Sequence, residues 1–424
     1  MPDRETKNTS VRDLSLDPVS GCGPVAGPTE TLVRPLRRQL YETIRAAGVI
    51  ARVDIAKQLS ISPATVTTLS TELIAAGLIS ETELPRRDGD SARGRPPVGL
   101  RIEGRAGAVI GIKISDRVNT AVVLDMAGQR IGSASLPAPP QRRSTQEILD
   151  EIETTVDVAL ANAGIERSQL SSLAIGAPGM VDHKAGRVIW CPFMEEADVA
   201  LREILAERIN VPVTIDNDAN LLALAELWFG VGRELDNFAV VSIEHGVGIG
   251  FVLNQTLQRG GMGHGMELGH INVQMDGALC RCGKRGCLEA YVADYALVRE
   301  AHVVLNQPTT GEAIPYNDML ETMFARAKSG DAAAKAIFSR AGRYLASGLA
   351  NIVTLFDPAL ILLSGDRLRY DYLYAEEVLT EFRELTRKPG RPPTPVEVHA
   401  WGDLIWAQGA GALALDHATE ILLG

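Results

Sequence analysis

The 424-residue sequence has few aromatic residues, few cysteines and no long apolar run. Aromatic residues make up 5% of the chain, and 5 residues are cysteine. No run of about 18 or more apolar residues occurs, which predicts that no segment spans a membrane. The first residues lack the apolar stretch of a secretory signal. With cysteines this sparse, these absences predict a cytoplasmic protein that makes no membrane contact.

Basic residues are also in deficit, with 42 Lys and Arg against 53 Asp and Glu and a formal net charge of −11. A surplus of acid by itself argues against nucleic-acid binding, because nucleic acids are polyanions. The charge is unevenly distributed, however. Residues 1–105 carry 15 Lys or Arg and 13 Asp or Glu, whereas the remainder carries 27 and 40. A slightly basic segment ahead of an acidic body is typical of a separate module that faces nucleic acid.

The length predicts two or three domains, and a hydrophobic content of 46% is ordinary for a globular protein. Residues 1–31 are rich in Pro, Gly, Ser, Thr and charged residues. Such a segment buries too little apolar surface to offset the cost of ordering it, so we predict a disordered tail. Cys22, inside this tail, and Cys191, in an apolar strand-like run, are interpreted as structural or incidental.

Residues 32–105 are predicted to form a winged helix-turn-helix domain. Apolar residues recur at near-helical spacing over 32–48, and a second, short helix is predicted over 53–59. After a turn, Ser62 is a favourable N-cap and Pro63 suits the first position of a further helix. Two short helices around a turn are the core of a helix-turn-helix, and the latter of the two would be the recognition helix.

The exposed face of this recognition helix and the loop after it carry the residues predicted to contact DNA. The face is short and polar, which suits a major groove. Strands at 78–79 and 98–102 flank a loop with the string Arg-Gly-Arg-Pro, an extended cationic segment that fits a minor groove or follows phosphates. The alternative is a small helical packing domain with a solvated arginine loop. The predicted DNA contacts are Ser62, Ala64, Thr65, Thr67, Thr68, Arg93 and Arg95.

Three of the five cysteines lie within eight residues, at Cys280, Cys282 and Cys287, and His270 precedes the first of them by ten positions. One histidine and three cysteines form a common structural zinc set, and the intervening glycines supply the tight turns that a metal-binding loop needs. A disulfide is a weaker interpretation, because Cys280 and Cys282 are too close to bridge each other and three cysteines leave one unpaired. Three reduced thiols in a glycine-rich loop are the remaining alternative. The pattern favours one structural Zn²⁺ ion.

From residue 106 the pattern changes to alternating strands and helices. Two mixed α/β lobes are predicted, over 106–228 and 229–402, each beginning with a β-meander, and a final helix over 403–424 is predicted to return to the first lobe. This arrangement predicts an actin/hexokinase-like (ribonuclease H-like) α/β fold with a ligand cleft between its lobes.

These features together resemble the ROK family of repressors, open reading frames and sugar kinases. The resemblance covers residues 32–424. Its most specific element is the string Gly-His-x₉-Cys-x-Cys-Gly-x-x-Gly-Cys-x-Glu, which ends at Glu289. Weaker family blocks match at Gly176–Gly179, Asn217–Asn220 and Gly246–Gly250. By this resemblance the histidine and three cysteines of the string are the zinc ligands.

The resemblance also implies a sugar site, with Asp218 at the position of the kinases' general base. Carboxylates and amides are independently suited to a polyol, because they accept from and donate to paired hydroxyls. For Asp216 to Asp218 the alternative is a simple turn and helix cap. The implied sugar-contacting residues are Asn217, Asp218, Glu267, His270 and Glu289.

The ATP side departs from the family's kinases. Their first phosphate loop reads Asp-x-Gly-Gly-Thr, but here Lys113 holds the Asp position and both glycines are replaced. The second loop has Glu244-His245 where the kinases have Gly-Thr, and a carboxylate there repels a triphosphate. The adenosine-side glycine pair has become Ser364-Gly365. These changes predict that the chain is not an enzyme.

We therefore predict a sugar-responsive DNA-binding transcription regulator, a repressor of carbohydrate uptake or catabolism genes. Its predicted partners are double-stranded operator DNA and a sugar or sugar-phosphate effector. A homodimer or homotetramer would present two winged helices to a two-fold operator. The alternatives are an ATP-dependent sugar kinase, and a regulator controlled by a protein partner with a vestigial cleft. Phe193 bears on the latter, because it either reshapes or fills the pocket or is a core residue.

Overall fold

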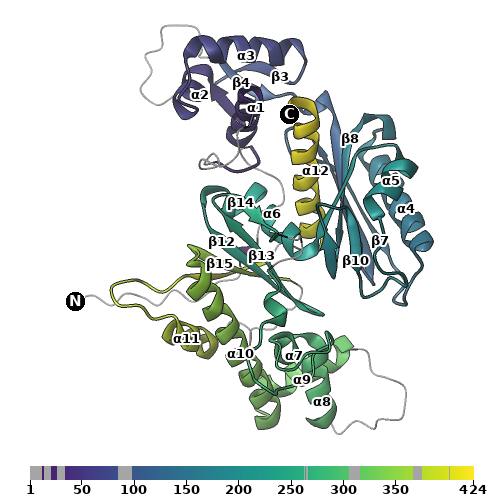
Figure 1. Ribbon diagram of the computed structural model, residues 1–424, viewed down its shortest axis with the longest axis vertical. Coiled ribbons are helices and arrows are strands. Elements are labelled where there is room, and N and C mark those ends of the chain that lie inside the picture. The colour runs from purple at the N-terminus through teal and green to yellow at the C-terminus, as the bar shows by residue number, and fades with distance from the viewer. Residues whose placement is uncertain are drawn as a thin grey trace. The chain divides into compact units, whose positions relative to one another are not determined.

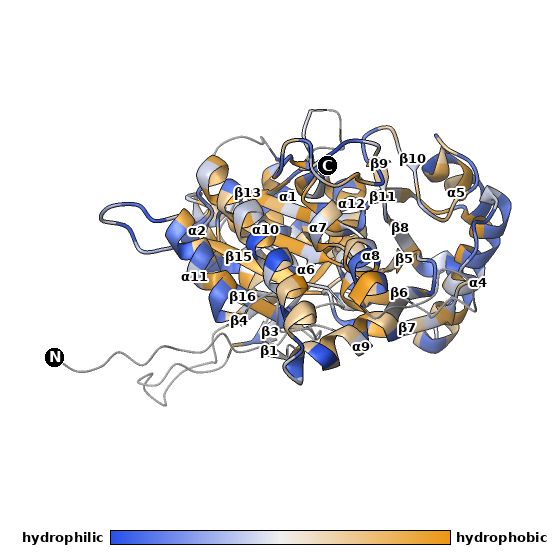
Figure 2. Ribbon diagram, turned by 90° about the horizontal axis from the view of Figure 1, so that it is seen from below, coloured by the Kyte–Doolittle hydropathy of each residue, from blue (hydrophilic) through white to orange (hydrophobic). Residues whose placement is uncertain are grey.

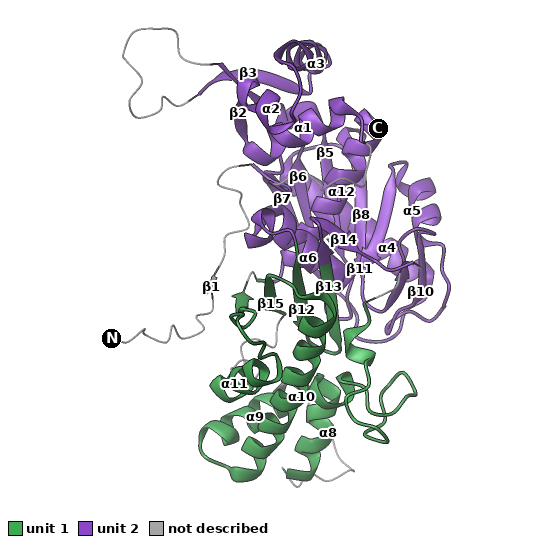
Figure 3. Cartoon of the chain, turned by 60° about the vertical axis from the view of Figure 1, so that its left-hand side comes forward, with its two compact units in different colours: residues 1–14, 237–251, 265–402 green, residues 15–236, 252–264, 403–424 purple. Residues whose placement is uncertain are grey.

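The computed structural model describes residues 12–13, 21–25, 34–84, 98–261, 263, 266–304, 316–365, 375–400 and 402–424. The chain divides into two compact units (Figure 3). Unit 1 comprises Met1–Leu14, Asn237–Phe251 and Gly265–Gly402, and unit 2 comprises Ser15–Asp236, Val252–His264 and Asp403–Gly424.

The N-terminal part of unit 2 contains three helices and a small antiparallel sheet (Figure 1). The helices are α1 (Leu36–Ala47), α2 (Arg52–Gln58) and α3 (Pro63–Ala75). The sheet has the order β2-β4-β3, from β2 (Val49–Ala51), β4 (Val98–Ile102) and β3 (Ile79–Glu83). Ser62 caps α3 as predicted, because its Oγ accepts a hydrogen bond from Thr65 N at 3.1 Å. The predicted DNA contacts Arg93 and Arg95 lie outside the described residues.

The larger sheet of unit 2 has five strands in the order β11-β8-β5-β6-β7. They are β5 (Ala108–Lys113), β6 (Val118–Asp125), β7 (Arg130–Pro137), β8 (Leu170–Ala177) and β11 (Val213–Asn217). β5 pairs antiparallel with β6 but parallel with β8, so the sheet is mixed. The short strands β9 (Met180–Asp182) and β10 (Arg187–Trp190) form a hairpin, and α5 (Leu201–Ile209) follows it.

Helices cover both faces of this sheet. α4 (Thr145–Ala163) is amphipathic (Figure 2) and packs its apolar residues against Ile110 and Ile112 of β5. On the opposite face lie α6 (Asp218–Phe229) and α12 (Ile405–Leu423). At Gly111 the backbones come so close that an added Cβ would lie 2.1 Å from Gly411 N of α12. Only glycine fits there, and this contact places α12 flat on β5.

Unit 1 has a sheet that carries β1-β16-β15-β12-β13 in this order. These strands are β1 (Arg12–Asp13), β16 (Val396–Ala400), β15 (Leu360–Ser364), β12 (Phe238–Ile243) and β13 (Val247–Leu253). β12 and β15 pair in parallel, and nearly all their side chains are buried. Helices α8 (Asp294–Val304), α9 (Tyr316–Lys328), α10 (Ala332–Phe356) and α11 (Glu376–Leu385) complete the core.

The prediction of a disordered tail over 1–31 fails for residues 21–25. Cys22 is fully buried, and its backbone N–H donates to Arg45 O at 3.0 Å. Gly23 N–H donates to Trp228 O at 2.9 Å. Gly21 and Gly23 have φ of +65° and +95°, values that other residues rarely adopt, so the two glycines let the segment fold onto the rest of unit 2. Among the described helices, none is long and apolar enough to cross a membrane.

Candidate metal centre and ligand site

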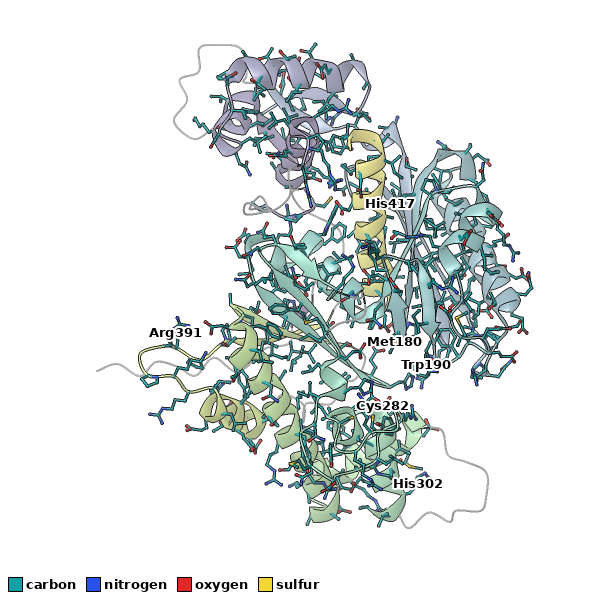
Figure 4. All side chains as sticks on the ribbon, in the orientation of Figure 1. Met180, Trp190, Cys282, His302, Arg391 and His417 are labelled. Carbon is teal, nitrogen blue, oxygen red and sulfur yellow. The ribbon has the colours of Figure 1, made fainter. Side chains whose placement is uncertain are left out.

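The structure brings together the four predicted metal ligands. His270 ends the short helix η4 (Leu268–His270), and Cys280, Cys282 and Cys287 lie in the loop that follows. The four candidate ligand atoms lie within 4.8 Å of one another. Cys280 Sγ is 3.6 Å from His270 Nδ1, and Cys282 Sγ is 3.7 Å from Cys287 Sγ. Cys282 is exposed at the edge of the loop (Figure 4), whereas Cys280 and Cys287 are buried.

These separations fit a zinc ion. With Zn–S near 2.3 Å and Zn–N near 2.0–2.1 Å, a tetrahedral site needs about 3.8 Å between sulfurs and about 3.6 Å between sulfur and nitrogen. The Sγ–Sγ distance of 3.7 Å is far longer than a disulfide bond of about 2.05 Å. All four positions of a tetrahedron are filled by protein ligands, so an ion held here has no open position for chemistry.

The backbone of the loop supports this cluster. Two isolated antiparallel bridges, Asn272 with Cys287 and Leu279 with Arg285, close the loop on itself. Gly286 has φ of +78°, and an added Cβ would lie 1.8 Å from Gln274 O. The chain must therefore cross itself tightly at Gly286, which explains the glycine directly before the last cysteine.

Two predicted sugar-contacting carboxylates flank the metal cluster. Glu267 is exposed and lies directly before η4, and its carbonyl accepts a hydrogen bond from His270 N at 3.0 Å. Glu289 begins α7 (Glu289–Val292), two residues after Cys287. Glu289 Oε2 accepts from Val247 N at 3.4 Å. The loop therefore fixes the backbone of both carboxylates.

Asn217 and Asp218, the remaining predicted sugar residues, belong to unit 2. They stand where β11 ends and α6 begins. Asn217 Oδ1 accepts from Ala219 N at 2.9 Å, and its Nδ2 donates to Gly179 O at 2.7 Å. Asn217 thus serves as a helix cap, the alternative weighed for this segment. Burial raises the pKa of Asp218, and the nearby positive charge of Lys113 opposes that rise.

Asp216, predicted only as part of a turn, holds a buried ion pair directly before Asn217. It is fully buried, and its Oδ2 accepts from Arg259 Nε at 2.7 Å. Its Oδ1 accepts from Asn220 Nδ2 at 2.8 Å and from the backbone N–H of Asn217 at 2.8 Å. The pair ties the segment after β14 (Thr256–Gln258) to the end of β11. An acidic residue ending a buried apolar strand is the signal that could have revealed it.

The turn that corresponds to the first phosphate loop is closed by its own hydrogen bonds. Ser115 N donates to Asn119 Oδ1 at 2.9 Å. Ser115 Oγ accepts from Arg117 N and Val118 N, both at 3.0 Å. Lys113, at the start of the turn, places its Nζ 3.5 Å from the centre of the Trp406 ring. These three backbone N–H groups therefore already have hydrogen-bond acceptors, and a phosphate would have to displace those acceptors in order to bind.

The stretch corresponding to the second phosphate loop is also occupied by side chains. His245 Nδ1 lies 3.2 Å from Oδ2 of the buried Asp294, and Asp294 N donates to Glu244 O at 3.2 Å. An added Cβ at Gly365 would lie 3.3 Å from Glu244 Cγ, so this side chain covers the remaining adenosine-side glycine. A nucleotide would have to displace both side chains of the Glu-His pair.

Phe193 is a core residue of unit 2. It is buried in the cluster between the large sheet and α4, and the guanidinium of Arg143 lies 4.5 Å from its ring centre. Arg143 in turn donates to Ser115 O at 2.8 Å and to Glu151 Oε2 at 2.7 Å. Of the alternatives considered for Phe193, its environment is therefore that of a core residue.

The α3 face predicted to meet DNA is accessible. Ser62, Ala64, Thr67 and Thr68 are exposed, and Thr65 is half-buried. The hydroxyls of Thr67 and Thr68 donate to carbonyls one turn earlier in the helix, at 2.9 and 3.2 Å. Each hydroxyl proton is therefore used within the helix. The face offers methyl groups and acceptor oxygens to a groove.

Within unit 2, α1 is fixed to α6 and α12 by buried arginines. Arg45 of α1 is buried, donates to Thr419 Oγ1 at 2.7 Å and lies 4.5 Å from the ring centre of Trp228. Arg38 donates to Asp416 Oδ1 at 2.9 Å. α6 therefore carries Asn217 and Asp218 at its start and touches α1 through Trp228 at its end.

This chain is similar to known proteins in sequence and in fold. The ROK family model matches residues 109–417. The "DNA-binding transcriptional dual regulator NagC" of Escherichia coli (strain K12) is 29% identical over 330 residues, which cover 77% of this chain and 79% of that protein.

Two solved structures extend the likeness. The crystal structure of a ROK family transcriptional regulator, a homolog of the E. coli Mlc protein, has a TM-score of 0.74 at 26% identity and covers 92% of this chain and 97% of its own. A ROK family glucokinase from Streptomyces griseus, in complex with glucose and AMPPNP, has a TM-score of 0.61 at 29% identity. It covers 73% of this chain and 100% of its own.

The regulator structure covers 92% of this chain, whereas the glucokinase covers 73%. The predicted fold class is confirmed: an N-terminal region of helices and strands precedes two mixed sheets that form the family's actin-like body. With the His/Cys cluster in place, the chain is a member of the ROK family.

Proposed function

We propose that this protein is a sugar-responsive, DNA-binding transcription repressor that regulates genes of carbohydrate uptake or catabolism. The observation that carries the proposal is the junction in unit 2, where one helix, α6, connects predicted sugar residues to the helical region that would bind DNA. The NagC dual regulator and the Mlc homolog, both transcriptional regulators, support the assignment.

The DNA half rests on α3. Its capped start and exposed short side chains suit insertion into a major groove. We propose Ser62, Ala64, Thr65, Thr67 and Thr68 as groove contacts. We also propose that the arginines at 93 and 95 contact the minor groove or the phosphates. Binding through phosphates would weaken as salt rises.

The effector half rests on paired carboxylates and amides. We propose that Asn217, Asp218, Glu267, His270 and Glu289 contact a sugar or sugar phosphate, and that a structural Zn²⁺ held by His270 and the three cysteines orients Glu267 and Glu289. Asp218 directly follows β11, and the positive charge of nearby Lys113 favours its carboxylate form. The cap and the Gly179 contact use one lone pair and one N–H of the Asn217 amide, which leaves one of each for a hydroxyl.

We propose that the chain has no phosphoryl-transfer activity. Phosphate loops work through free backbone N–H groups that point at the ligand. Three N–H groups of the corresponding turn instead donate to Asn119 and to Ser115 Oγ. The glucokinase structure shows that family members with this body include kinases, so incubation with sugars, Mg²⁺ and ATP is a direct check. We expect no release of ADP above the background without protein.

A ligand changes DNA affinity only if it binds the two arrangements of the protein with different affinities. Residues at the start of α6 sense the sugar in this proposal, and Trp228 at its end contacts Arg45 of α1. A shift of this single helix would therefore reach the DNA-binding region directly. Assembly into a homodimer or homotetramer would present two such regions to a two-fold operator.

The test uses the purified full-length chain and DNA from upstream of its own gene in a fluorescence anisotropy titration. The titration is repeated with a panel of monosaccharides, N-acetylhexosamines and sugar phosphates. We expect one member to change the DNA affinity at least severalfold. Asp218→Asn should bind DNA as the wild type does and lose the response, whereas Glu377→Gln, an exposed carboxylate on α11, should keep it. Identical titrations with and without every sugar would contradict the sensing half.

A further inference from the structure

The hydroxyl of Tyr295, on α8, lies between a metal ligand and a predicted sugar carboxylate of unit 1. Tyr295 Oη is 3.5 Å from Cys280 Sγ and 3.4 Å from Glu289 Oε1. The two acceptors are themselves 3.7 Å apart. The guanidinium of Arg281 lies 4.1 Å from the centre of the Tyr295 ring and covers it. One hydroxyl therefore bridges two groups with separate tasks.

Metal binding changes what this hydroxyl must do. In a metal-free loop Cys280 can keep its S–H and donate it to Glu289. A zinc ligand is a thiolate, which has no proton to give. Three thiolates, a neutral imidazole and Zn²⁺ sum to a charge of −1, and the Glu289 carboxylate then faces a second anionic group. Tyr295 is placed to donate a proton into this contact.

We propose that Tyr295 is a positioning residue that couples metal occupancy to Glu289. In the loaded site its single hydroxyl proton points between the Cys280 thiolate and Glu289 Oε1 and is shared by both, which reduces their mutual repulsion and fixes the side chain of Glu289 where the proposed function needs it. The inference rests on the proposed roles of zinc and of Glu289. Hydrogen bonds from groups around the ligands commonly set the affinity and geometry of metal sites in this way.

Tyr291, on the preceding helix α7, provides a matched control. Tyr291 also supports the loop: its hydroxyl accepts from Ala278 N at 2.8 Å, and its ring stacks on Tyr344 with centroids 3.9 Å apart. Its ring packs against the cluster of Cys280, Cys287 and Ala290, whereas its hydroxyl bonds to the loop backbone and not to Cys280 or Glu289. Tyr291→Phe and Tyr295→Phe therefore remove the same atom from neighbouring positions, and only Tyr295→Phe removes a donor to the metal ligand.

The experiment measures metal binding by the full-length protein, without a sugar. Zn²⁺ is titrated against a chromogenic chelator, and Co²⁺ is loaded in parallel to record the sulfur-to-cobalt charge-transfer band. We expect Tyr295→Phe to weaken Zn²⁺ binding by about 10–100-fold and to shift the cobalt band. Tyr291→Phe should stay within about 3-fold of the wild type with an unshifted band, since its hydroxyl touches no ligand.

Glu289→Gln supplies the second arm. Removing the carboxylate charge beside a site of net charge −1 should tighten Zn²⁺ binding, and in this background Tyr295→Phe should cost several-fold less than it does alone. Additive effects of the two substitutions, or equal effects of the two tyrosine variants, would overturn the role of Tyr295. A wild-type protein that takes up neither metal would overturn this inference together with the metal site. Loss of DNA or sugar binding with metal binding intact would instead contradict the proposed function alone.

Discussion

Replacing Arg259 with methionine should destabilise unit 2 by leaving the carboxylate of Asp216 buried without its cation. Asp216 has no exposed surface, and its Oδ2 accepts from Arg259 Nε at 2.7 Å. Removing one partner of a buried ion pair costs about 3–5 kcal/mol. The hydrogen bonds from Asn220 and Asn217 to Oδ1 remain, which places the expected loss near the lower end, at about 3 kcal/mol.

Urea unfolding followed by tryptophan fluorescence is a suitable assay, because three of the four tryptophans, Trp190, Trp228 and Trp406, belong to unit 2. With a slope of about 3 kcal/mol per M, the unfolding midpoint should fall by about 1 M urea. Changing Asp216→Asn as well removes the stranded charge, and the double variant should recover to within about 1 kcal/mol of the wild type.

An exposed pair of the same geometry provides the control. Arg187 Nε is also 2.7 Å from a carboxylate oxygen, that of Asp198, but both side chains are substantially exposed. Arg187→Met should therefore shift the unfolding midpoint much less than Arg259→Met does. If Arg259→Met shifts the midpoint no more than Arg187→Met, or if the double variant is less stable than Arg259→Met alone, the reasoning from burial is wrong.

Three further predictions address other parts of the molecule. Cys282→Ser should lower the zinc content measured by elemental analysis and increase proteolysis within 264–290; full zinc content with unchanged stability would refute the metal site. Gly111→Ala should lower the melting temperature sharply or prevent folding, because its Cβ would meet backbone of α12, whereas Gly261→Ala, with nothing within 4 Å, should not. Burial lowers the pKa of His417 on α12 (Figure 4), so the unfolded chain takes up this proton more readily. Stability should therefore fall as pH drops below the ordinary value of 6.5, and His417→Asn should flatten that fall in urea titrations at several pH values.

How much of the site could be predicted depended on how local its determinants are. The metal ligands were readable because the chemistry of zinc limits the residue types and their spacing along a short loop. The cap at Ser62 could be predicted for the same reason, since Ser62 and its hydrogen-bond partner Thr65 lie within one helical turn. The roles implied for Asn217 and Asp218 came from the resemblance and stay predictions.

Features that depend on contacts between residues far apart in the sequence could not be predicted from the sequence. Cys22 stands in a polar segment, but its side chain reaches the carbonyl of Ala127, 105 residues away, so its burial depends on a surface that the local sequence does not describe. Asp216 likewise needs Arg259, 43 residues later. The replaced glycines indicated a lost phosphate loop, but the way Ser115 Oγ satisfies the turn's backbone is a matter of three-dimensional geometry.

The docking of α1 onto α12 has a consequence for the order of events during synthesis. Arg38 and its partner Asp416 are 378 residues apart, and most of unit 1 lies between them in the chain. At about 5–20 residues per second, roughly 20 to 75 s pass between the translation of the two. During that interval the N-terminal helices can fold but lack the surface that holds them. A nascent or truncated chain would thus expose its proposed DNA-binding region before the body can hold it, and the proposed coupling of the two would require the completed chain.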